Sequence, residues 1–249
     1  MIDLHCHILP GVDDGALDVR DSLAMARQAQ TDGIEMVCAT PHIRHDHPLA
    51  IEEIEERVDA LQAAVDANGI DVRIVPGGEL AQTEVDRLDD EQLRAVSLGG
   101  ARDRANGRPG GWVLLEPAPG PLADGLNEAV ARLTERGMRT VIAHPERHAG
   151  VDFAERLRGL VDAGCLVQWT AEFIAQAPVG EYVMGLAREG LVHVLGSDAH
   201  SSHGGRPVRL AAGFANLARV CSPEQMDWTI RTAPAAIVRG DRTLSVPAG

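Results

Sequence analysis

The chain is predicted to be an α/β protein in which seven parallel strands and the helices between them form a distorted (β/α) barrel. Two observations predict this class. Short apolar runs bounded by glycine, proline or polar residues alternate with amphipathic helical patterns along all 249 residues. In addition, histidines and carboxylates stand at or just after the ends of these runs, where the loops of a parallel barrel converge on one cavity.

The apolar runs are typical of buried parallel strands, which lack the in-and-out alternation of half-exposed strands. They are predicted at residues 2–6, 36–40, 72–75, 112–116, 140–143, 166–168 and 193–196. Alternate side chains of a strand share a face. His5 and His7 are therefore expected to point together toward one site, while Leu4, Cys6 and Ile8 point the other way into the packing.

The helices are predicted from apolar residues at helical spacing. One such stripe, which ends at Asn68-Gly69, consists of Ile51, Ile54, Val58, Leu61 and Val65. A second, which ends near Gly137, consists of Leu122, Leu126, Val130 and Leu133. No linker, low-complexity tract or repeat divides the chain, so residues 1–249 are expected to form a single domain. The glycine- and arginine-rich segment 99–111 is predicted to be a solvated, mobile loop.

Charge and composition exclude several classes of protein. The formal net charge is −14, and all 23 basic residues are arginines. The absence of lysine excludes Schiff-base chemistry and a P-loop lysine, and the acidic charge argues against stable binding to nucleic acid. No apolar run approaches the roughly 18 residues of a membrane span, and no leader is recognised. The four scattered cysteines suggest no disulfide framework, so a cytoplasmic protein without a transmembrane segment is expected.

The polar residues at the strand ends are of the types that bind transition metals. They are His5, His7, Asp13, Asp14, His42, Glu79, Glu116, His144, Asp198 and His200. A single histidine beside a strand is more often structural, but packing does not explain the same placement at strand after strand. Imidazoles bind a transition ion, and carboxylates can bridge two ions. The mixture suits Mn²⁺, Fe²⁺ or Zn²⁺ rather than Ca²⁺.

Such a site would give an acidic protein a cationic pocket. Three divalent ions held by four carboxylates and neutral histidines would leave a charge of about +2, which attracts phosphate. A water bound to such an ion loses its proton near neutral pH and can attack phosphorus without a catalytic serine or cysteine. Arg147 and Arg206 stand close to these ligands in the sequence and are expected to clamp the phosphate oxygens. The expected reaction is phosphoester hydrolysis.

These residues, in this order, resemble the PHP (polymerase and histidinol phosphatase) superfamily. Within it, the chain is similar to the capsular polysaccharide branch (CpsB/CapC-like) of metal-dependent protein-tyrosine phosphatases. The matching segments are 3–15, 39–42, 77–79, 114–116, 142–147, 196–200 and 205–207. The Val-Asp-Asp-Gly extension after His-x-His and the Ala-His-Pro-Glu-Arg segment separate this branch from histidinol phosphatases and from polymerase-associated domains of the superfamily.

The resemblance implies a distorted seven-stranded TIM-like barrel with three ions, often Mn²⁺, at the C-terminal rim of the strands. It also implies that the substrate is phosphotyrosine on a bacterial tyrosine kinase, or a related phosphoprotein, that controls extracellular polysaccharide. The residues that match ligand positions are His5, His7, His42, Glu79, Glu116, His144, Asp198 and His200. Asp14 matches the carboxylate of the third ion, with Asp13 beside it. Arg147 and Arg206 match substrate-binding arginines, and Gln168 matches a polar residue at a strand end.

Two stretches depart from the pattern of this branch. Residues 169–173, Trp-Thr-Ala-Glu-Phe, are bulkier than the small polar run that is usual after Gln168. The segment 99–111 is an insertion before the strand that starts at Trp112. Both could reshape access of the substrate to the site.

Four alternatives stay open. Cys38 and Arg44 fit the Cys-x5-Arg signature of thiol-based tyrosine phosphatases, but Pro41 removes a phosphate-binding N–H and Cys38 lies in an apolar strand, so the fit is interpreted as accidental. The substrate could be histidinol phosphate or another small alkyl phosphate, whose alkoxide leaves less readily than a phenolate of pKa about 10. A nuclease is disfavoured by the acidic charge. A non-catalytic, metal-stabilised phosphotyrosine binder is the fourth, and the sequence indicates no oligomeric state.

Overall fold

The computed structural model describes residues 1–99, 111–176, 179–241 and 244–247. In these residues short parallel strands alternate with helices, as the sequence predicts. The strands are β1 Ile2–Cys6, β2 Met36–Ala39, β3 His42–Ile43, β4 Arg73–Pro76, β5 Glu79–Ala81, β6 Trp112–Glu116, β7 Arg139–Ile142, β8 Leu166–Thr170 and β9 Val194–Gly196. All pairings between them are parallel.

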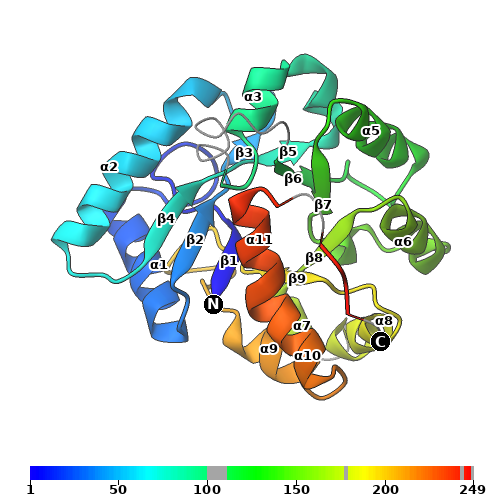
Figure 1. Ribbon diagram of the computed structural model, residues 1–249. Coiled ribbons are helices and arrows are strands. Elements are labelled where there is room, and N and C mark those ends of the chain that lie inside the picture. Colours follow the sequence, from blue (N-terminus) through cyan, green and yellow to red (C-terminus); the bar gives the residue numbers. More distant parts are fainter. Residues whose placement is uncertain (100–110, 177–178, 242–243, 248–249) are drawn as a thin grey trace.

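The helices lie around the outside of the strands (Figure 1). They are α1 Val19–Asp32, α2 Ile54–Ala67, α3 Asp90–Ala95, α5 Asp124–Glu135, α6 Phe153–Asp162, α7 Ala171–Ala175, α8 Val179–Arg188, α9 Ala211–Leu217, α10 Pro223–Asp227 and α11 Ala233–Arg239. Shorter helical turns are η1 Ile51–Glu53, η2 Gln82–Arg87, η3 Pro145–His148 and η4 Trp228–Thr232. Among the helices of the described residues, none is both long and apolar enough to cross a membrane.

The strands form two curved sheets that meet at β1 and β9. One sheet has the order β1-β2-β4 and the other the order β3-β5-β6-β7-β8-β9. A parallel bridge between Cys6 and Ala199 joins the end of β1 to the segment after β9, and the Asp198 N–H donates to the His5 carbonyl over 2.8 Å. Because these contacts bring the two ends of the sheet sequence together, residues 5–7 and 198–200 lie side by side.

Two of the seven predicted strands are interrupted, which gives nine strands in the described part of the chain. β2 stops at Ala39 and resumes as β3 after Thr40-Pro41, and β4 stops at Pro76 and resumes as β5 after Gly77-Gly78. Pro41 has no N–H to donate to a ladder, but its carbonyl accepts from the Glu79 N–H over 3.0 Å. The interruptions therefore lie beside each other, and His42 pairs with Glu79 just beyond them.

The hydrophobic core has two parts. The larger cluster fills the space between the sheets and the outer helices and contains Cys6 and Ile8. The smaller lies among the strands and contains Leu4, Cys38 and Leu114, and it is covered by Ile237 of α11. Leu4, Cys6 and Ile8 are all buried in packing, as the sequence predicts, but Leu4 packs in the smaller cluster and does not share a face with Cys6 and Ile8. The pairing of β1 with β2 shifts register between Asp3 and Cys6, which breaks the simple alternation of faces.

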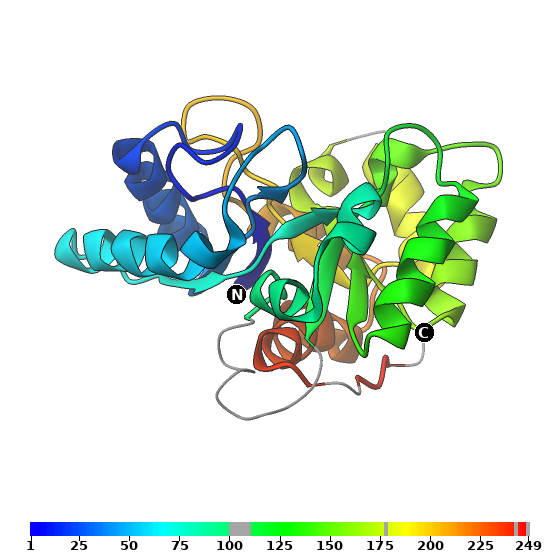
Figure 2. The same cartoon turned by 90° about the horizontal axis from the view of Figure 1, so that it is seen from above.

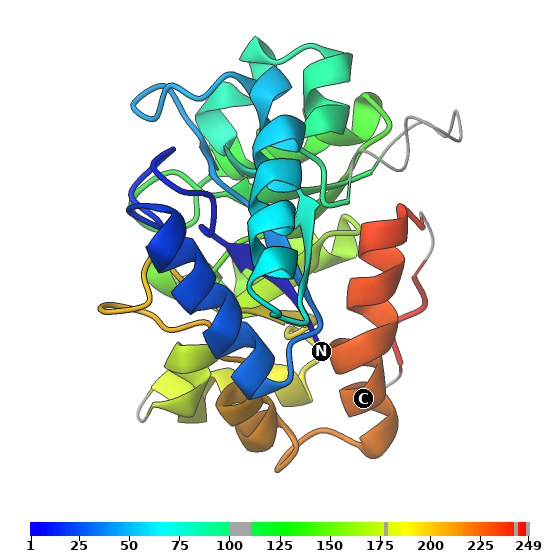
Figure 3. The same cartoon turned by 90° about the vertical axis from the view of Figure 1, so that its left-hand side faces the viewer.

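The two ends of the strand assembly have different characters. Figure 2 shows α11 on one side of the strands, and the loops that follow β1 and β9 on the opposite side. Figure 3 shows α1 and α2 packed side by side along the outside. The apolar inner cluster and α11 thus close the end where the strands begin, and the carboxyl ends of the strands are left to the polar loops.

Candidate metal centre

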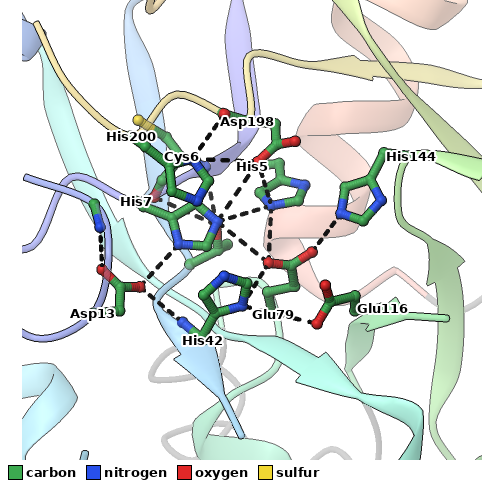
Figure 4. Close-up of polar contacts among 12 residues, drawn as sticks. His5, Cys6, His7, Asp13, His42, Glu79, Glu116, His144, Asp198 and His200 are labelled. Atoms are coloured by element: carbon green, nitrogen blue, oxygen red, sulfur yellow. Dashed lines mark hydrogen bonds and ion pairs between the residues drawn. The ribbon is translucent and has the colours of Figure 1, made fainter. Parts of the chain in front are cut away.

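His5 and His7 of the first strand segment converge, as the sequence predicts. Both are buried, and their Nε2 atoms lie 3.2 Å apart (Figure 4). Their Nδ1 atoms point in other directions: that of His5 lies 3.0 Å from Gln168 Oε1, and that of His7 lies 2.9 Å from Asp13 Oδ2. The second nitrogen of each ring is thus anchored by an oxygen, the usual arrangement for a metal-binding imidazole.

Glu79, the first residue of β5, lies at the centre of the imidazoles (Figure 4). Its Oε1 is 2.7 Å from His144 Nε2. Its Oε2 is 3.3 Å from His5 Nε2, 3.2 Å from His7 Nε2 and 3.1 Å from His42 Nδ1. Burial alone would raise the pKa of this carboxyl, but the surrounding imidazoles outweigh it and hold the pKa well below its usual value. Glu79 is therefore an anion with several ligand groups directed at it.

Asp198 brings the two predicted phosphate clamps to the site. Its Oδ1 is 3.5 Å from His5 Nε2 and 3.1 Å from Arg206 Nη2, and its Oδ2 is in contact with Arg147 Nη2. Both guanidinium groups are partly buried, and burial lowers the pKa of each. Both arginines therefore point at the ligand cluster and neutralise Asp198 in this arrangement.

Asp14 supplies a more exposed part of the cluster. Its Oδ1 lies 3.4 Å from His42 Nε2 and 3.4 Å from His200 Nε2. The His200 ring stacks on His7 with 3.9 Å between ring centroids. On the other side of His42, Glu116 Oε2 lies 3.8 Å from Nδ1. His42 thus contacts carboxylates through both ring nitrogens and lies between two groups of candidate ligands.

The ligand atoms fall into four overlapping groups whose members all lie within 4.8 Å of one another. These groups are His5, His7 and Asp198; His5, Glu79 and His144; His42, Glu79 and Glu116; and His7, Asp14, His42 and His200. All nine predicted ligands are included. The shared members indicate a cluster of adjacent positions rather than one isolated site.

Unpaired polar atoms support the fit of divalent ions to these residues. Glu79 Oε2 and His42 Nδ1, which lie 3.1 Å apart in the cluster, are buried without a hydrogen bond of acceptable geometry. Orphaned buried groups are costly, and a cation among converging carboxylate oxygens and imidazole nitrogens would satisfy them. The donor set therefore fits transition-metal ions.

In the described part of the chain, positive φ values outside glycine are confined to two of the predicted ligands. They are His144 (φ 28°) and Asp198 (φ 50°). Each lies just after a strand, β7 and β9 respectively, where the chain turns sharply. Such conformations persist where the surroundings impose them, and they concentrate at functional sites.

Asp13 and Gln168 lie one layer behind the ligands. The Asp13 carboxylate accepts from the backbone N–H groups of Gly15 and His42 over 2.9 Å each. Burial opposes ionisation of Asp13, but the bond to His7 and these N–H donors lower its pKa. Reciprocally, the pKa of His7 is raised to about 9, because the bonds to Asp13 and Glu79 outweigh its burial. These two side chains orient imidazoles from behind.

The sequence predicts that residues 169–173 and the segment 99–111 could reshape access to the site. Trp169 does not shape access to the site, because it is fully buried in the outer core, where its indole N–H donates to the Leu191 carbonyl over 3.0 Å. It faces outward because alternate residues of β8 point inward, including Gln168. The expected mobile loop 99–111 lies, apart from Gly99 and Gly111, outside the described residues.

The thiol-based alternative loses its nucleophile. Cys38 is fully buried in the inner cluster, and burial raises its pKa far above the usual value. A nucleophilic cysteine needs an accessible thiolate of lowered pKa. Arg44, the other half of that signature, instead lies with Nη1 3.6 Å from Glu116 Oε2 and is held by Asp46 through two hydrogen bonds.

Sequence reasoning missed Asp3, which joins β1 to β9 beneath the ligands. Its Oδ1 accepts from the His5 N–H over 3.1 Å and from the Ser197 N–H over 3.0 Å. Asp3 is fully buried. A carboxylate within a strand that is predicted to be buried was the signal for such a role, because buried acids are rarely unpaired.

The comparisons with known proteins agree with this geometry. A family model for capsular polysaccharide synthesis, CpsB/CapC, matches residues 1–239. Tyrosine-protein phosphatase YwqE of Bacillus subtilis is 30% identical over 209 residues, which cover 81% of this chain and 78% of YwqE. Putative tyrosine-protein phosphatase CapC of Staphylococcus aureus is 25% identical over 209 residues, 81% of this chain and 77% of CapC.

The chain is also similar to solved structures. A crystal structure from the pair YwqE from Bacillus subtilis and CpsB from Streptococcus pneumoniae, described as unique metal-dependent tyrosine phosphatases, superposes with a TM-score of 0.80. The match covers 98% of this chain and 96% of the other at 26% identity. An organophosphorus hydrolase shares the fold at a TM-score of 0.55 and 14% identity, with 95% and 92% of the two chains covered.

Proposed function

Because the chain belongs to the CpsB/CapC family of capsular polysaccharide synthesis, we propose that it is a metal-dependent protein-tyrosine phosphatase. The observation that carries the proposal is the set of four overlapping groups of candidate metal ligands, two of which share Glu79, with two arginines directed at the same cluster. Such an arrangement would combine metal ions with phosphate-binding cations, which is suited to hydrolysis of a phosphate ester.

We assign the nine clustered side chains to three divalent ions, with Mn²⁺ ahead of Fe²⁺ or Zn²⁺. When bound, these ions would act as Lewis acids toward the phosphate and lower the pKa of a water to roughly 7. The ligands are His5, His7, Asp14, His42, Glu79, Glu116, His144, Asp198 and His200. Asp13 and Gln168 support them from behind.

Arg147 and Arg206 would bind the phosphate of the substrate. The guanidinium groups of both arginines contact the Asp198 carboxylate. A phosphate that enters the site would therefore lie close to two cations beside the ligand cluster. Guanidinium groups bind phosphate oxygens in pairs and stabilise charge that develops in the transition state. A tyrosine phenolate, with pKa about 10, leaves without a strong proton donor, which suits a site rich in cations and ligands.

The finer assignments belong to the same proposal. The substrate is a tyrosine-phosphorylated protein of capsule or exopolysaccharide synthesis, such as a tyrosine kinase, in the cytoplasm. The strands form one closed ring of seven, in which β2 with β3 and β4 with β5 each count as one interrupted strand and the Cys6–Ala199 bridge completes the circuit. Residues 1–249 then form a single barrel domain.

Elemental analysis and a chelation assay test this function together. The purified protein is expected to contain Mn, Fe or Zn, to lose activity toward a phosphotyrosyl peptide in EDTA, and to regain it with Mn²⁺. Histidinol phosphate serves as the competing substrate. Comparable turnover of the two substrates would contradict the tyrosine assignment. Activity that survives EDTA but disappears in Cys38→Ser would contradict the metal mechanism.

A further inference from the structure

Gln168 occupies an unusual place in the site, because one oxygen atom serves two metal-ligand residues. The side chain is fully buried in β8. Its Oε1 accepts a hydrogen bond from the His144 backbone N–H over 3.3 Å and lies 3.0 Å from His5 Nδ1. Its Nε2 has no hydrogen-bond partner and lies against Gly196, where an added Cβ would come within 2.8 Å. Both contacts of the side-chain amide are therefore made by its oxygen.

The His144 N–H fixes which way this amide points. A backbone N–H can only donate, so the atom that faces it must be the oxygen of Gln168. His5 Nδ1 faces the same oxygen, which can only accept. Nδ1 of His5 must therefore carry the proton, and in the neutral ring the lone pair is left on Nε2, which faces Glu79 and His7.

The same bond also restrains the second residue. His144 has a φ of 28°, a conformation that is strained for a residue other than glycine. Its backbone N–H is tied to Gln168, and its Nε2 is tied to Glu79 over 2.7 Å. Gln168 thus contacts the backbone of His144, which follows β7, and the ring of His5 in β1.

A glutamine here avoids the cost of a further buried negative charge. Asp13 performs the corresponding task for His7, and Glu79 and Asp198 are already buried beside the same imidazoles. A further buried carboxylate would add like charge in a region of low dielectric. An amide accepts the same hydrogen bonds without that charge.

We propose that Gln168 is a positioning residue that selects the Nε2-ligating tautomer of His5 and holds His144 in its strained conformation. This inference rests on the proposed metal site. It concerns how the ligands are prepared for the ion, a role that is separate from contact with the substrate. It predicts that a side chain of similar length lacking the acceptor oxygen weakens metal binding even when the fold is intact.

The experiment compares Gln168→Met, which loses the acceptor, with Gln168→Glu, which keeps it. Gln176→Met on the exposed surface is the matched control. Free Mn²⁺ is measured by electron paramagnetic resonance during titration of each metal-free protein. We expect Mn²⁺ affinity to fall by about 10- to 100-fold in Gln168→Met, but by no more than about 3-fold in Gln168→Glu or in the control. Thermal unfolding verifies that each variant is folded.

A second measurement reports the tautomer without any metal. Long-range ¹H–¹⁵N spectra of the imidazole rings, with the His5 signals assigned through His5→Asn, are expected to show a proton on Nδ1 in the wild type and a partial loss of that signal in Gln168→Met. Wild-type Mn²⁺ affinity in Gln168→Met, or an unchanged His5 tautomer in that variant, would overturn the inference. If the wild type itself binds no metal ion, the proposed function fails, and the tautomer spectra still decide the role of Gln168.

Discussion

Single residues of this site are organised as ligands with supports behind them. His5 and His7 are held through their Nδ1 atoms by Gln168 and Asp13, while their Nε2 atoms face the cluster. The members of this cluster were predictable from the sequence, because histidines and acidic residues at strand ends are typical of metal sites. The role of Gln168 was not predictable from the sequence. It depends on one oxygen atom that contacts both His5 and His144, and no local sequence pattern indicates such a contact.

Arg206 offers a test of the phosphate clamp. Its Nη2 lies 3.1 Å from Asp198 Oδ1, and the side chain remains partly exposed toward the site. Arg206→Ala is expected to raise KM and lower kcat, with kcat/KM reduced by about 10- to 1,000-fold, because charge-assisted contacts to phosphate are lost in both the ground and transition states. Steady-state kinetics on an aryl phosphate measure this. Arg209→Ala, an exposed arginine three residues away, is the control. Unchanged kinetics in Arg206→Ala would remove this residue from the clamp.

His193 provides a pH test of stability away from the metal ligands. It is buried, its Nδ1 accepts from the Val167 N–H over 3.2 Å, and burial lowers its pKa from 6.5 to about 4. Between these pH values the unfolded chain binds a proton at this histidine and the folded chain does not. The free energy of unfolding should therefore fall as the pH is lowered through this window, by up to about 3 kcal/mol from this group.

Denaturant unfolding at pH 7, 6, 5 and 4 measures this effect. His193→Gln retains an acceptor for the Val167 N–H but has no proton to bind, so its stability should decline less than that of the wild type over the same range. Parallel pH profiles for the two proteins would show that His193 does not contribute.

At the level of elements, the predicted strands and helices agree with the structure except where packing breaks the regular pattern. β1 and β6 have the predicted bounds, because apolar runs with clear flanking residues define them locally. β3 and β5 were missed because they are only two and three residues long and contain His42 and Glu79, which also act as site residues. Pairing with neighbouring strands, rather than local propensity, makes these segments extended.

The loop after β1 depends on a close approach that only glycine permits. A Cβ on Gly15 would lie 2.3 Å from the His7 carbonyl oxygen and 2.5 Å from the His7 Cβ. Gly15→Ala should therefore displace Asp13 and His7, lower the free energy of unfolding by about 1–3 kcal/mol and weaken Mn²⁺ binding. Chemical denaturation and Mn²⁺ titration measure the two effects.

Gly159 in α6 is the matched control for that substitution. A Cβ there meets no atom within 4 Å, so Gly159→Ala should leave Mn²⁺ binding unchanged. It should increase stability by up to about 1 kcal/mol, because alanine favours the helix. Equal behaviour of the two alanine variants would show that the close approach at Gly15 does not constrain the loop.

At the scale of the whole molecule, the two ends of the strand assembly divide stability and function. The inner apolar cluster and α11 close one end, while buried histidines and carboxylates occupy the other. The class of fold could be predicted because alternating strand and helix patterns allow few arrangements. How the sheet ends meet could not, since the Cys6–Ala199 bridge joins residues 193 positions apart and depends on the final packing.

The polar end should make stability depend on bound metal. Glu79 and Asp198 are buried carboxylates beside several imidazoles, and Glu79 Oε2 and His42 Nδ1 lack hydrogen bonds. Divalent ions would satisfy these groups only in the folded protein, because the ligands come from strands that are far apart in the sequence. Binding at 100 times the dissociation constant would then stabilise the folded state by about 2.7 kcal/mol per site.

Thermal unfolding as a function of Mn²⁺ concentration measures this dependence. Tm should fall in EDTA, rise with added Mn²⁺ and respond much less to Ca²⁺, which prefers an oxygen-rich shell. In Asp198→Asn the response to Mn²⁺ should be reduced, because one anionic ligand and the partner of both arginines is lost. A Tm that is insensitive to EDTA and Mn²⁺ would mean that the cluster is stable as a network of histidine–carboxylate pairs alone. That result would contradict the proposed metal centre, because the buried polar atoms without hydrogen bonds would then be stable without an ion.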